Sequence, residues 1–420
     1  MEIDSALPEL RAVERALRET TETLACELNC ASATAPDWSA FQWQIALAVA
    51  VMHGVTPLLS STLRWRGPAT WQQFLSAQSA HTLVRQQRMV AVLANIDAAA
   101  RIEQVAILPL KGSALHELGI YQAGERPMAD IDLLVQPRDA AAATRLLARL
   151  GYRETGDTGR ERIFEPIGPA APAHWAEHGD NPVKIELHGR IAEPLPIATA
   201  DITAQLLPRP ALPGVNPYPT VAALMLHLLL HAAGSIRTRG LRLLQLHDIS
   251  RLASRLSRDD WERVLLPPGE PPSWWAYPPL LLTARYQLSS IPAPILARAR
   301  ALCPWPLRRV CERYRLADVS LSNIWTQAFS GIEWSGSVPE ALRYAYRRLF
   351  PDHAQRVQRQ LSAGQDWAAH SPWMRQSQAR RMLQWILSGH ARVPTLAAIR
   401  AATARPAISM AAAHGCGTDG

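Results

Sequence analysis

The sequence predicts an α+β protein in which a mixed sheet lies between two large helical regions. Apolar residues recur at helical spacing in the first part of the chain, short strand-like and helical segments alternate in the middle, and helical spacing then returns. At 420 residues the chain has room for about two or three domains. We expect a helical lobe over residues 1–102, a sheet core over 103–200, a helical domain over 201–404 and a disordered tail over 405–420.

The first region is expected to be helical throughout. Residues 7–28 and 79–102 carry apolar side chains at i, i+3 and i+4 spacing, which places them on one face of a helix. Between them, residues 35–59 are more apolar and predict a buried helix that ends at Gly54 and Pro57. We therefore expect a helical lobe packed on the sheet core.

The middle region alternates strands with helices. Apolar runs and period-two alternation predict five strands, over residues 105–110, 130–135, 152–155, 162–166 and 184–188. Helical spacing predicts two helices, over residues 113–121 and 137–150. The Pro- and Gly-rich run Pro166–Pro182 is expected to form a loop at the mouth of the candidate site. Its His174, Trp175 and His178 could contact a substrate or be ordinary loop residues.

The third region is expected to be helical and interrupted by prolines. His227 and His231 lie at i and i+4 in the apolar segment 219–234, a spacing that can hold zinc. The Glu of the metalloprotease motif His-Glu-x-x-His is missing, so histidines packed against the sheet core are the better interpretation. In the next helix, 241–253, Asp248 could cap the helix, pair with an arginine or line a cleft.

Arginines and aromatic residues interleave in two later segments, 296–317 and 341–361. This combination can bind nucleic acid through phosphate contacts and base stacking. Tyr344, Tyr346 and Leu349 fall at helical core spacing, however, which favours packing inside the protein.

Two carboxylates mark the strongest candidate site. Asp130 and Asp132 stand at i and i+2 in an apolar strand, so their side chains point to the same face. Two like charges aimed at one spot repel unless a positive charge lies between them, and a divalent cation is a common solution. The turn Lys111–Ser113 precedes them and offers small residues and backbone N–H groups to a phosphate. Metal-binding carboxylates beside a phosphate site predict phosphoryl or nucleotidyl transfer.

A third carboxylate follows in the segment 181–191. Apolar and polar residues alternate there, so Lys184, Glu186 and His188 share the polar face of a half-buried strand. Transfer with two metal ions needs a further carboxylate, and Glu186 could supply it. From the pattern alone, an amphipathic strand with a solvated polar face is an equally good interpretation.

Lysine usage supports the same two strands. The chain has 44 basic residues, of which only Lys111 and Lys184 are lysines. Lysine is a compact, strongly hydrated charge and arginine a planar fork, so the two do not substitute for each other at a tight phosphate position. Chance also accounts for a pattern of only two residues.

These motifs resemble those of the nucleotidyltransferase superfamily of the DNA polymerase beta type, and most closely its branch of uncharacterised bacterial nucleotidyltransferases. The shared pattern reads Leu110–Gly112, then Arg126 before Asp130–Val135, then Glu186–His188. The resemblance covers about residues 85–255. The residues between the first two motifs are more numerous than in minimal members of the superfamily, as is typical of this branch.

The resemblance implies a polymerase-beta-like fold, transfer of a nucleoside monophosphate from a nucleoside triphosphate, and a role for each motif residue. Three carboxylates would be catalytic and would hold two Mg²⁺ (or Mn²⁺) ions: Asp130, Asp132 and Glu186. Six residues would contact the nucleotide: Lys111, Gly112, Ser113, Arg126, Lys184 and His188. His188 could equally support one of the acids. The acceptor can be RNA, protein or a small molecule.

Two alternatives remain open. A phosphotransferase related to aminoglycoside or choline kinases needs a His-x-Asp…Asn catalytic loop followed by a metal-binding Asp, and we find no such complete loop in the sequence. A catalytically silent nucleotide-binding or scaffold protein of the same fold is the other, although all three acids are present.

Composition adds limits on partners and compartment. The net charge of +8 suits an anionic partner, but arginines spread over helix surfaces explain it equally simply. Five cysteines without a Cys-x-x-Cys pair fit a reducing cytoplasm. The N-terminus shows no signal peptide, and the most apolar stretches, Ile45–Leu59 and Ala222–Ala233, are shorter than the roughly 20 residues of a membrane span. We therefore expect a cytoplasmic protein without a membrane span.

Overall fold

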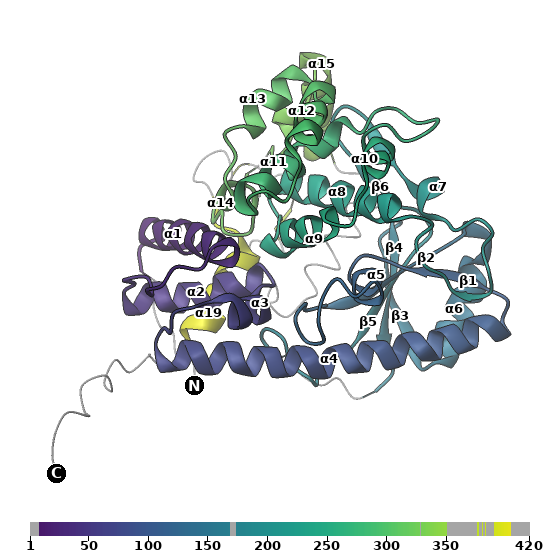
Figure 1. Ribbon diagram of the computed structural model, residues 1–420, viewed down its shortest axis with the longest axis horizontal. Helices are drawn as coiled ribbons and strands as arrows, with labels where there is room; N and C mark the ends of the chain where they lie inside the picture. Colours follow the sequence, from purple (N-terminus) through teal and green to yellow (C-terminus); the bar gives the residue numbers. More distant parts are fainter. Residues whose placement is uncertain are drawn as a thin grey trace, which may run out of the picture.

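The computed structural model describes residues 8–168, 174–327, 329–350, 376–377, 380, 383 and 390–404. It has the expected α+β architecture, with a six-stranded mixed sheet and helices on either side along the chain (Figure 1). The predicted tail, 405–420, lies outside the described residues.

The N-terminal helices follow the predicted pattern. They are α1 (Leu10–Asn29), α2 (Ala40–Met52), α3 (Thr56–Thr62) and α4 (Ala69–Ile102). The Ser39 hydroxyl caps α2 by accepting from the Gln42 backbone N–H, which satisfies a donor left free at the helix start. Gly54 adopts a φ of 66° after α2, and Pro57 lies in the first turn of α3, so the predicted interruption is confirmed.

Helix α4 joins the helical lobe to the sheet. Its first part packs Trp71 and Phe74 into the helical core, whereas Met89 and Ile96 lie in a second core beneath the strands. Figure 1 shows the helix running under both parts. The lobe and the sheet core therefore share one rigid element, and a domain boundary at residue 102 stays a prediction.

The sheet has the strand order β3-β4-β5-β2-β1-β8. The strands in this order are β3 (Tyr152–Asp157), β4 (Glu161–Pro166), β5 (Lys184–His188), β2 (Asp130–Val135), β1 (Ala106–Pro109) and β8 (Gly214–Val215). β2 pairs with β5 and β1 with β8 in parallel, and the other pairs are antiparallel. The five predicted strands are confirmed, and β8 escaped prediction because two residues carry no periodicity. A separate hairpin joins β6 (Ala192–Pro194) and β7 (Thr199–Asp201).

Strand alternation gives the sheet two different faces. Ile131, Leu133 and Ile185 point toward α4 and α6 (Ala140–Arg149) and form a compact apolar core with them. Asp132 and Glu186 belong to the opposite set of side chains. They face the C-terminal helices, and the start of the short helix α5 (Gly112–Glu117) lies beside them in the same cavity.

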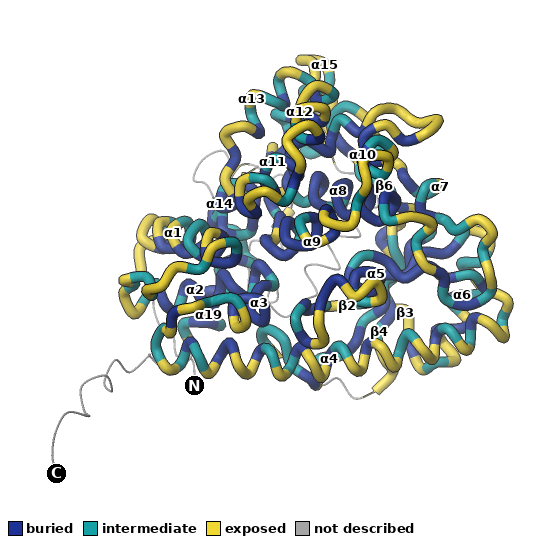
Figure 2. Tube along the Cα trace, viewed as in Figure 1, coloured by how far each residue is buried: buried dark blue, intermediate teal, exposed yellow. Residues whose placement is uncertain are grey.

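The C-terminal region is helical, as predicted. Its helices are α7 (Thr203–Leu206), α8 (Val221–Thr238), α9 (Leu243–Ala253), α10 (Arg258–Leu265), α11 (Tyr277–Tyr286), α12 (Ala293–Leu302), α13 (Trp305–Cys311), α14 (Leu316–Val319), α15 (Val338–Leu349) and α19 (Val393–Thr403). Figure 2 shows α8 deep in the molecule. Helix α19 returns to pack against α2, so the last described helix lies in the N-terminal lobe (Figure 1).

Among the described residues, α8 is the one helix that is long and apolar enough by itself to cross a membrane, and 72% of it is buried inside the protein. The bent pair α2 and α3 passes the same length and composition test only when taken together. A mostly buried helix of this kind is what the core of a folded domain requires.

Helix α15 corrects an expectation from the sequence. Tyr344, Tyr346 and Leu349 were expected in a core, but no residue of α15 is fully buried and Tyr346 is 62% exposed. Helical spacing defines a common face and does not say whether another element covers it. Residues 351–361 of the same arginine-rich segment lie outside the described residues.

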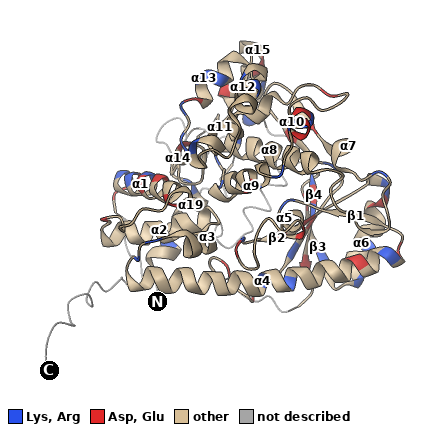
Figure 3. Ribbon diagram, in the orientation of Figure 1, with Lys and Arg blue, Asp and Glu red and all other residues tan. Residues whose placement is uncertain are grey.

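Charged residues are dispersed over the described surface. Figure 3 shows Lys and Arg on helices throughout the molecule, interleaved with Asp and Glu on α1 and α10. This distribution agrees with arginines spread over helix surfaces.

Candidate functional site

The three predicted carboxylates converge because β2 and β5 are adjacent parallel strands. Their register places Asp132 opposite Glu186 and Asp130 opposite Lys184. Asp130, Asp132 and Glu186 all line one cavity of about 330 Å³, named here the carboxylate cavity. Its far wall comes from α8, α9 and the turn between them.

Asp132 lies at the centre of the contacts. Its Oδ1 accepts a hydrogen bond from Lys111 Nζ at 3.0 Å and lies 3.0 Å from His188 Nε2. The same His188 nitrogen is 3.9 Å from Glu186 Oε2. The Asp132 and His188 side chains are each 9% exposed, so solvent screens these charges only weakly.

The three carboxylates carry more negative charge than the neighbouring lysine can neutralise. Burial raises the pKa of Asp132, but Lys111 and His188 more than offset that effect and hold the pKa well below its usual range. Burial, together with Asp130 and Asp132, raises the pKa of Glu186 to about 9. Burial and Asp132 likewise raise the pKa of Asp130. Lys111 therefore neutralises one carboxylate, and within the described residues neither Asp130 nor Glu186 forms an ion pair with a lysine or arginine.

A strained turn holds Lys111 in place. Lys111 has a φ of 46°, a left-handed value that side chains other than glycine rarely adopt. Its backbone N–H donates to the Tyr218 hydroxyl at 3.3 Å, and that hydroxyl lies 2.8 Å from His227 Nδ1. Such strain persists only where the surroundings enforce it, as they do here beside the carboxylates.

The Gly-Ser turn is present, with one change from expectation. A Cβ atom on Gly112 would collide with the side chains of Arg126 and Met128, so a larger residue there would have to displace the ends of both side chains. The Ser113 backbone N–H donates to the Leu110 carbonyl at 3.2 Å and is already engaged. Both residues line the carboxylate cavity, so the structure places the turn where the sequence predicted it.

Arg126 lies at the cavity wall in a buried ion pair. Its Nε and Nη2 donate to the two carboxylate oxygens of Asp248 at 2.8 and 2.7 Å. The Tyr121 hydroxyl donates to the same carboxylate at 2.8 Å. Of the roles considered for Asp248, pairing with an arginine and lining a cavity are both confirmed. Because this pair occupies two of its nitrogens, Arg126 offers a ligand less than the expected free guanidinium.

Lys184 lies elsewhere than predicted. Its Nζ is 2.6 Å from Glu165 Oε1 on β4, its side chain is 44% exposed, and it does not line the carboxylate cavity. The strand face was predicted correctly. However, β5 lies between β2 and β4, and the lysine pairs with the acid on the β4 side.

Two arginines of the site escaped the sequence analysis. Arg242 lines the cavity, and its charge lowers the pKa of Asp130. Arg85 is 3% exposed in α4 and donates to the carbonyls of Asn181 and Ala129 at 2.8 and 3.0 Å, which fixes the chain just before Asp130. Among so many arginines neither stood out, although an arginine on the apolar face of a predicted helix was a usable signal.

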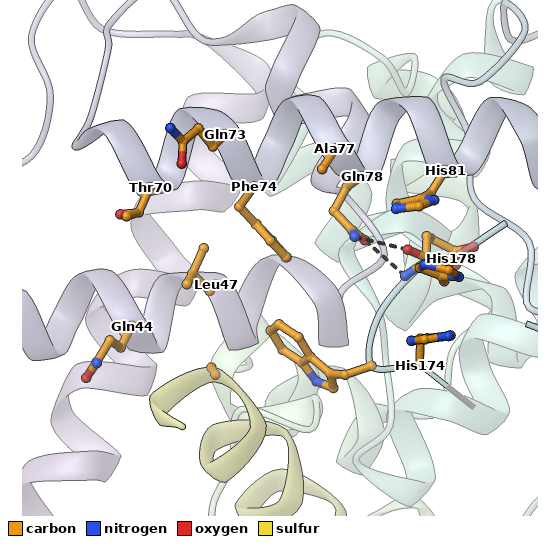
Figure 4. A pocket seen from close by; sticks show the side chains of 13 residues that line it. Gln44, Leu47, Thr70, Gln73, Phe74, Ala77, Gln78, His81, His174 and His178 are labelled. Atoms are coloured by element: carbon orange, nitrogen blue, oxygen red, sulfur yellow. Dashed lines mark hydrogen bonds between the residues drawn. The ribbon is translucent and has the colours of Figure 1, made fainter. Parts of the chain in front are cut away.

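The loop histidines do not line the carboxylate cavity. They border a second cavity of about 490 Å³ against α2 and α4. Figure 4 shows His81, His178 and His174 stacked beside α4, with ring centroids 4.2 and 3.8 Å apart. Trp175 stacks on Phe74, with centroids 5.7 Å apart. The loop therefore packs on the helical lobe, which corrects its expected place at the mouth of the site.

Within the described residues, two groups of side chains bring three possible metal ligands within 4.8 Å of one another. The first, named the carboxylate cluster, is Asp132, Glu186 and His188. The second, named the imidazole cluster, is His174, His178 and Asp180. In the first group His188 stands where the sequence predicted Asp130, which lines the same cavity. Oxygen-rich ligands with too little positive charge suit a hard divalent cation.

Comparison with protein families gives a match over the region that contains this cavity. A family model described as "Uncharacterised nucleotidyltransferase" matches residues 39–266, more than half of the chain. The comparisons with curated proteins and with solved structures found no match. The matched range extends from α2 to the end of α10 and contains the whole carboxylate cavity. The chain therefore belongs to this family of uncharacterised nucleotidyltransferases.

Proposed function

We propose that the protein is a metal-dependent nucleotidyltransferase with a polymerase-beta-like core. It transfers a nucleoside monophosphate from a nucleoside triphosphate to an acceptor hydroxyl. The observation that carries the proposal is the convergence of Asp130, Asp132 and Glu186 on one cavity that also contains the Gly112-Ser113 turn. The family match supports the same chemistry.

The residues divide the work by position. Asp132 and Glu186, with Asp130 and His188 beside them, would hold Mg²⁺ or Mn²⁺, which would neutralise phosphate charge and orient the reacting groups. Lys111 holds the Asp132 carboxylate in its present orientation through the 3.0 Å hydrogen bond.

The triphosphate would lie along the Gly-Ser turn. Gly112 and Ser113 line the cavity, the Ser113 hydroxyl offers a donor, and Arg242 brings positive charge from the opposite wall. Arg126 acts mainly by fixing the wall through Asp248. In this arrangement the α-phosphate of the nucleotide would lie beside the carboxylates.

The transfer itself is balanced without a further reactant. The acceptor oxygen forms a bond to the α-phosphorus, and the bond from that phosphorus to the bridging oxygen breaks. Pyrophosphate leaves with the electron pair of the broken bond. The acceptor hydroxyl would be activated by a metal ion that these carboxylates hold or by Glu186, and its proton would pass to solvent.

Transfer of label tests the proposal. Each of four α-³²P nucleoside triphosphates is incubated with Mg²⁺, host lysate and either wild type or Asp132→Asn, and the protein, RNA and small-molecule fractions are counted. Label that requires wild type and Mg²⁺ is expected, because the substitution removes a charge and keeps the shape. Full activity of Asp132→Asn would contradict the proposal. Mg²⁺-dependent nucleotide binding without transfer would favour a silent binding protein.

A further inference from the structure

A third cavity lies on the other side of the catalytic carboxylate. It has a volume of about 300 Å³ and is named here the arginine cavity. It shares four lining residues with the carboxylate cavity: Lys111, Glu186, His231 and Ser235. Glu186 therefore stands between two spaces, one beside the Gly-Ser turn and one without a role so far.

The far end of the arginine cavity is positively charged. Arg160 Nη2 donates to Glu193 Oε1 at 2.8 Å, and Arg237 Nη2 lies 4.0 Å from the other oxygen of Glu193. Two guanidinium groups thus share one carboxylate, and these three groups together carry one net positive charge. The Glu161 carboxylate also lines the cavity and lies 3.8 Å from His188 Nδ1.

Arg237 is held in place with little of its bonding capacity used. Its side chain is 11% exposed, and in the described part of the chain Nη1 donates to the Tyr344 hydroxyl at 3.3 Å. Arg160 is 46% exposed and donates from Nη2 to the Ala192 carbonyl and to Glu193, so among the described residues its Nε and Nη1 remain for a ligand. A planar guanidinium fork matches the oxygens of a phosphate or a carboxylate.

Glycine in α8 shapes this end of the cavity. A Cβ atom on Gly234 would lie 2.6 Å from the Glu193 carboxyl carbon, so any other residue would push that carboxylate away. The close approach of β6 to α8 brings Glu193 between the two arginines. The charge arrangement is therefore built into the packing of the fold.

We propose that the arginine cavity binds the acceptor, and that the acceptor is a small molecule with an oxyanion group, a phosphate or a carboxylate, beside its reacting hydroxyl. This rests on the proposed function. The oxyanion binds Arg160 and Arg237, and the hydroxyl reaches Glu186 from the side opposite the Gly-Ser turn. Attack on the α-phosphorus then proceeds in line with the departing pyrophosphate, with the bonds and proton as balanced above.

Binding of inorganic phosphate tests this assignment. Untagged full-length protein with Mg²⁺ and a saturating α,β-methylene nucleotide is dialysed against ³²P-phosphate. Wild type is expected to bind phosphate together with the nucleotide. Arg237→Gln and the more exposed Arg160→Gln are expected to weaken phosphate binding about tenfold or more, because each removes a charge-assisted hydrogen bond. Nucleotide affinity should stay unchanged in both variants. The surface variant Arg138→Gln is the control, since that side chain is 76% exposed and outside the cavity.

Two results would overturn the assignment: phosphate that binds Arg160→Gln and Arg237→Gln as it binds wild type, or phosphate that the nucleotide displaces. Competition by methyl phosphate or by acetate identifies which oxyanion the cavity prefers, and competition by neither also overturns it. Nucleotide binding is measured in the same samples. Absence of nucleotide binding in wild type would count against the proposed function. Phosphate binding, measured with and without nucleotide, separately decides whether the arginine cavity binds an oxyanion.

Discussion

The carboxylate cluster and the imidazole cluster contain the same kinds of side chain in different surroundings. Each brings histidine and carboxylate groups within 4.8 Å of one another. Asp132 and His188 are buried on paired strands, and Lys111 bonds to Asp132. In the imidazole cluster, His174 is exposed and its ring stacks on that of His178, and Asp180 is 82% exposed.

Burial and a fixed backbone separate these two regions more than residue type does. Strand pairing sets the distance between Asp132 and Glu186 through the register, whereas the ring planes of stacked imidazoles direct their nitrogens in parallel and not toward a common point. Buried charges interact strongly because water does not screen them. These differences support the proposal that catalysis belongs to the carboxylate cluster, and matched pairs of variants test that proposal.

The largest difference is expected between Glu186→Gln and Asp180→Asn. The first removes a buried acid of the carboxylate cluster, and transfer should fall about a thousandfold, as expected for the loss of several kcal/mol of metal-assisted stabilisation. The second changes an exposed acid and should stay within about twofold of wild type. Initial rates of label transfer measure both. Equal losses in the two variants would remove the distinction between the clusters.

A similar contrast is expected in stability between two arginines with acidic neighbours. Arg126→Ala breaks a buried pair with Asp248 and should lower the free energy of unfolding by about 3–5 kcal/mol, because it leaves a buried charge without its partner. Arg138→Ala removes a side chain that is 76% exposed and should change that free energy by less than about 0.5 kcal/mol. Urea unfolding gives both values. A loss below about 1 kcal/mol in Arg126→Ala would show that the pair with Asp248 does not stabilise the fold as a buried ion pair should.

The two lysines should differ by less. Lys111→Arg places a planar fork where a single ammonium bonds to Asp132, so turnover should fall about tenfold. Lys184→Arg keeps an exposed pair with Glu165 and should lose no more than about twofold. Turnover with saturating nucleotide measures both effects. A larger loss in Lys184→Arg would restore the role that the sequence predicted for that residue.

The smallest effect is expected from the buried histidine His53, and it concerns how the free energy of unfolding depends on pH. Burial, and then Arg242, lowers its pKa from 6.5 to about 3, and its Nδ1 accepts from the Leu243 N–H at 3.0 Å. The unfolded chain binds the proton more readily, so the stabilising contribution is present above pH 6.5 and is lost as the pH falls toward 3, at about 1.4 kcal/mol per pH unit. His53→Gln should lose this part of the slope in urea unfolding between pH 6.5 and 4.5. An unchanged slope would contradict the burial argument, and His178→Gln serves as the control.

The sequence predicted the parts of the fold and site that depend on local periodicity. Alternation placed Asp130, Asp132, Glu186 and His188 on the correct strand faces, and the apolar runs located five of the six strands of the sheet. The neighbours across the sheet were beyond local pattern. Lys184 pairs with Glu165 because β4 lies beside β5 in the sheet. The alternation of residues in β5 would be the same with any other neighbouring strand, so it could not predict this pair.

Contacts between distant segments were the least predictable. Asp248 pairs with Arg126, 122 positions away in the sequence. Arg85, in helix α4, donates to the carbonyl of the residue before Asp130. The loop histidines were expected at the mouth of the candidate site. Packing of Trp175 on Phe74 instead draws the loop toward the helical lobe.

Binding of Mn²⁺ followed by electron paramagnetic resonance tests the central claim most directly. Wild type, Asp132→Asn and Asp180→Asn are titrated with Mn²⁺ in the presence of a non-hydrolysable nucleotide. We predict that Asp132→Asn loses the bound-ion signal and that Asp180→Asn keeps it. Retention of the signal in Asp132→Asn together with its loss in Asp180→Asn would contradict the assignment of the metal site to the carboxylate cluster.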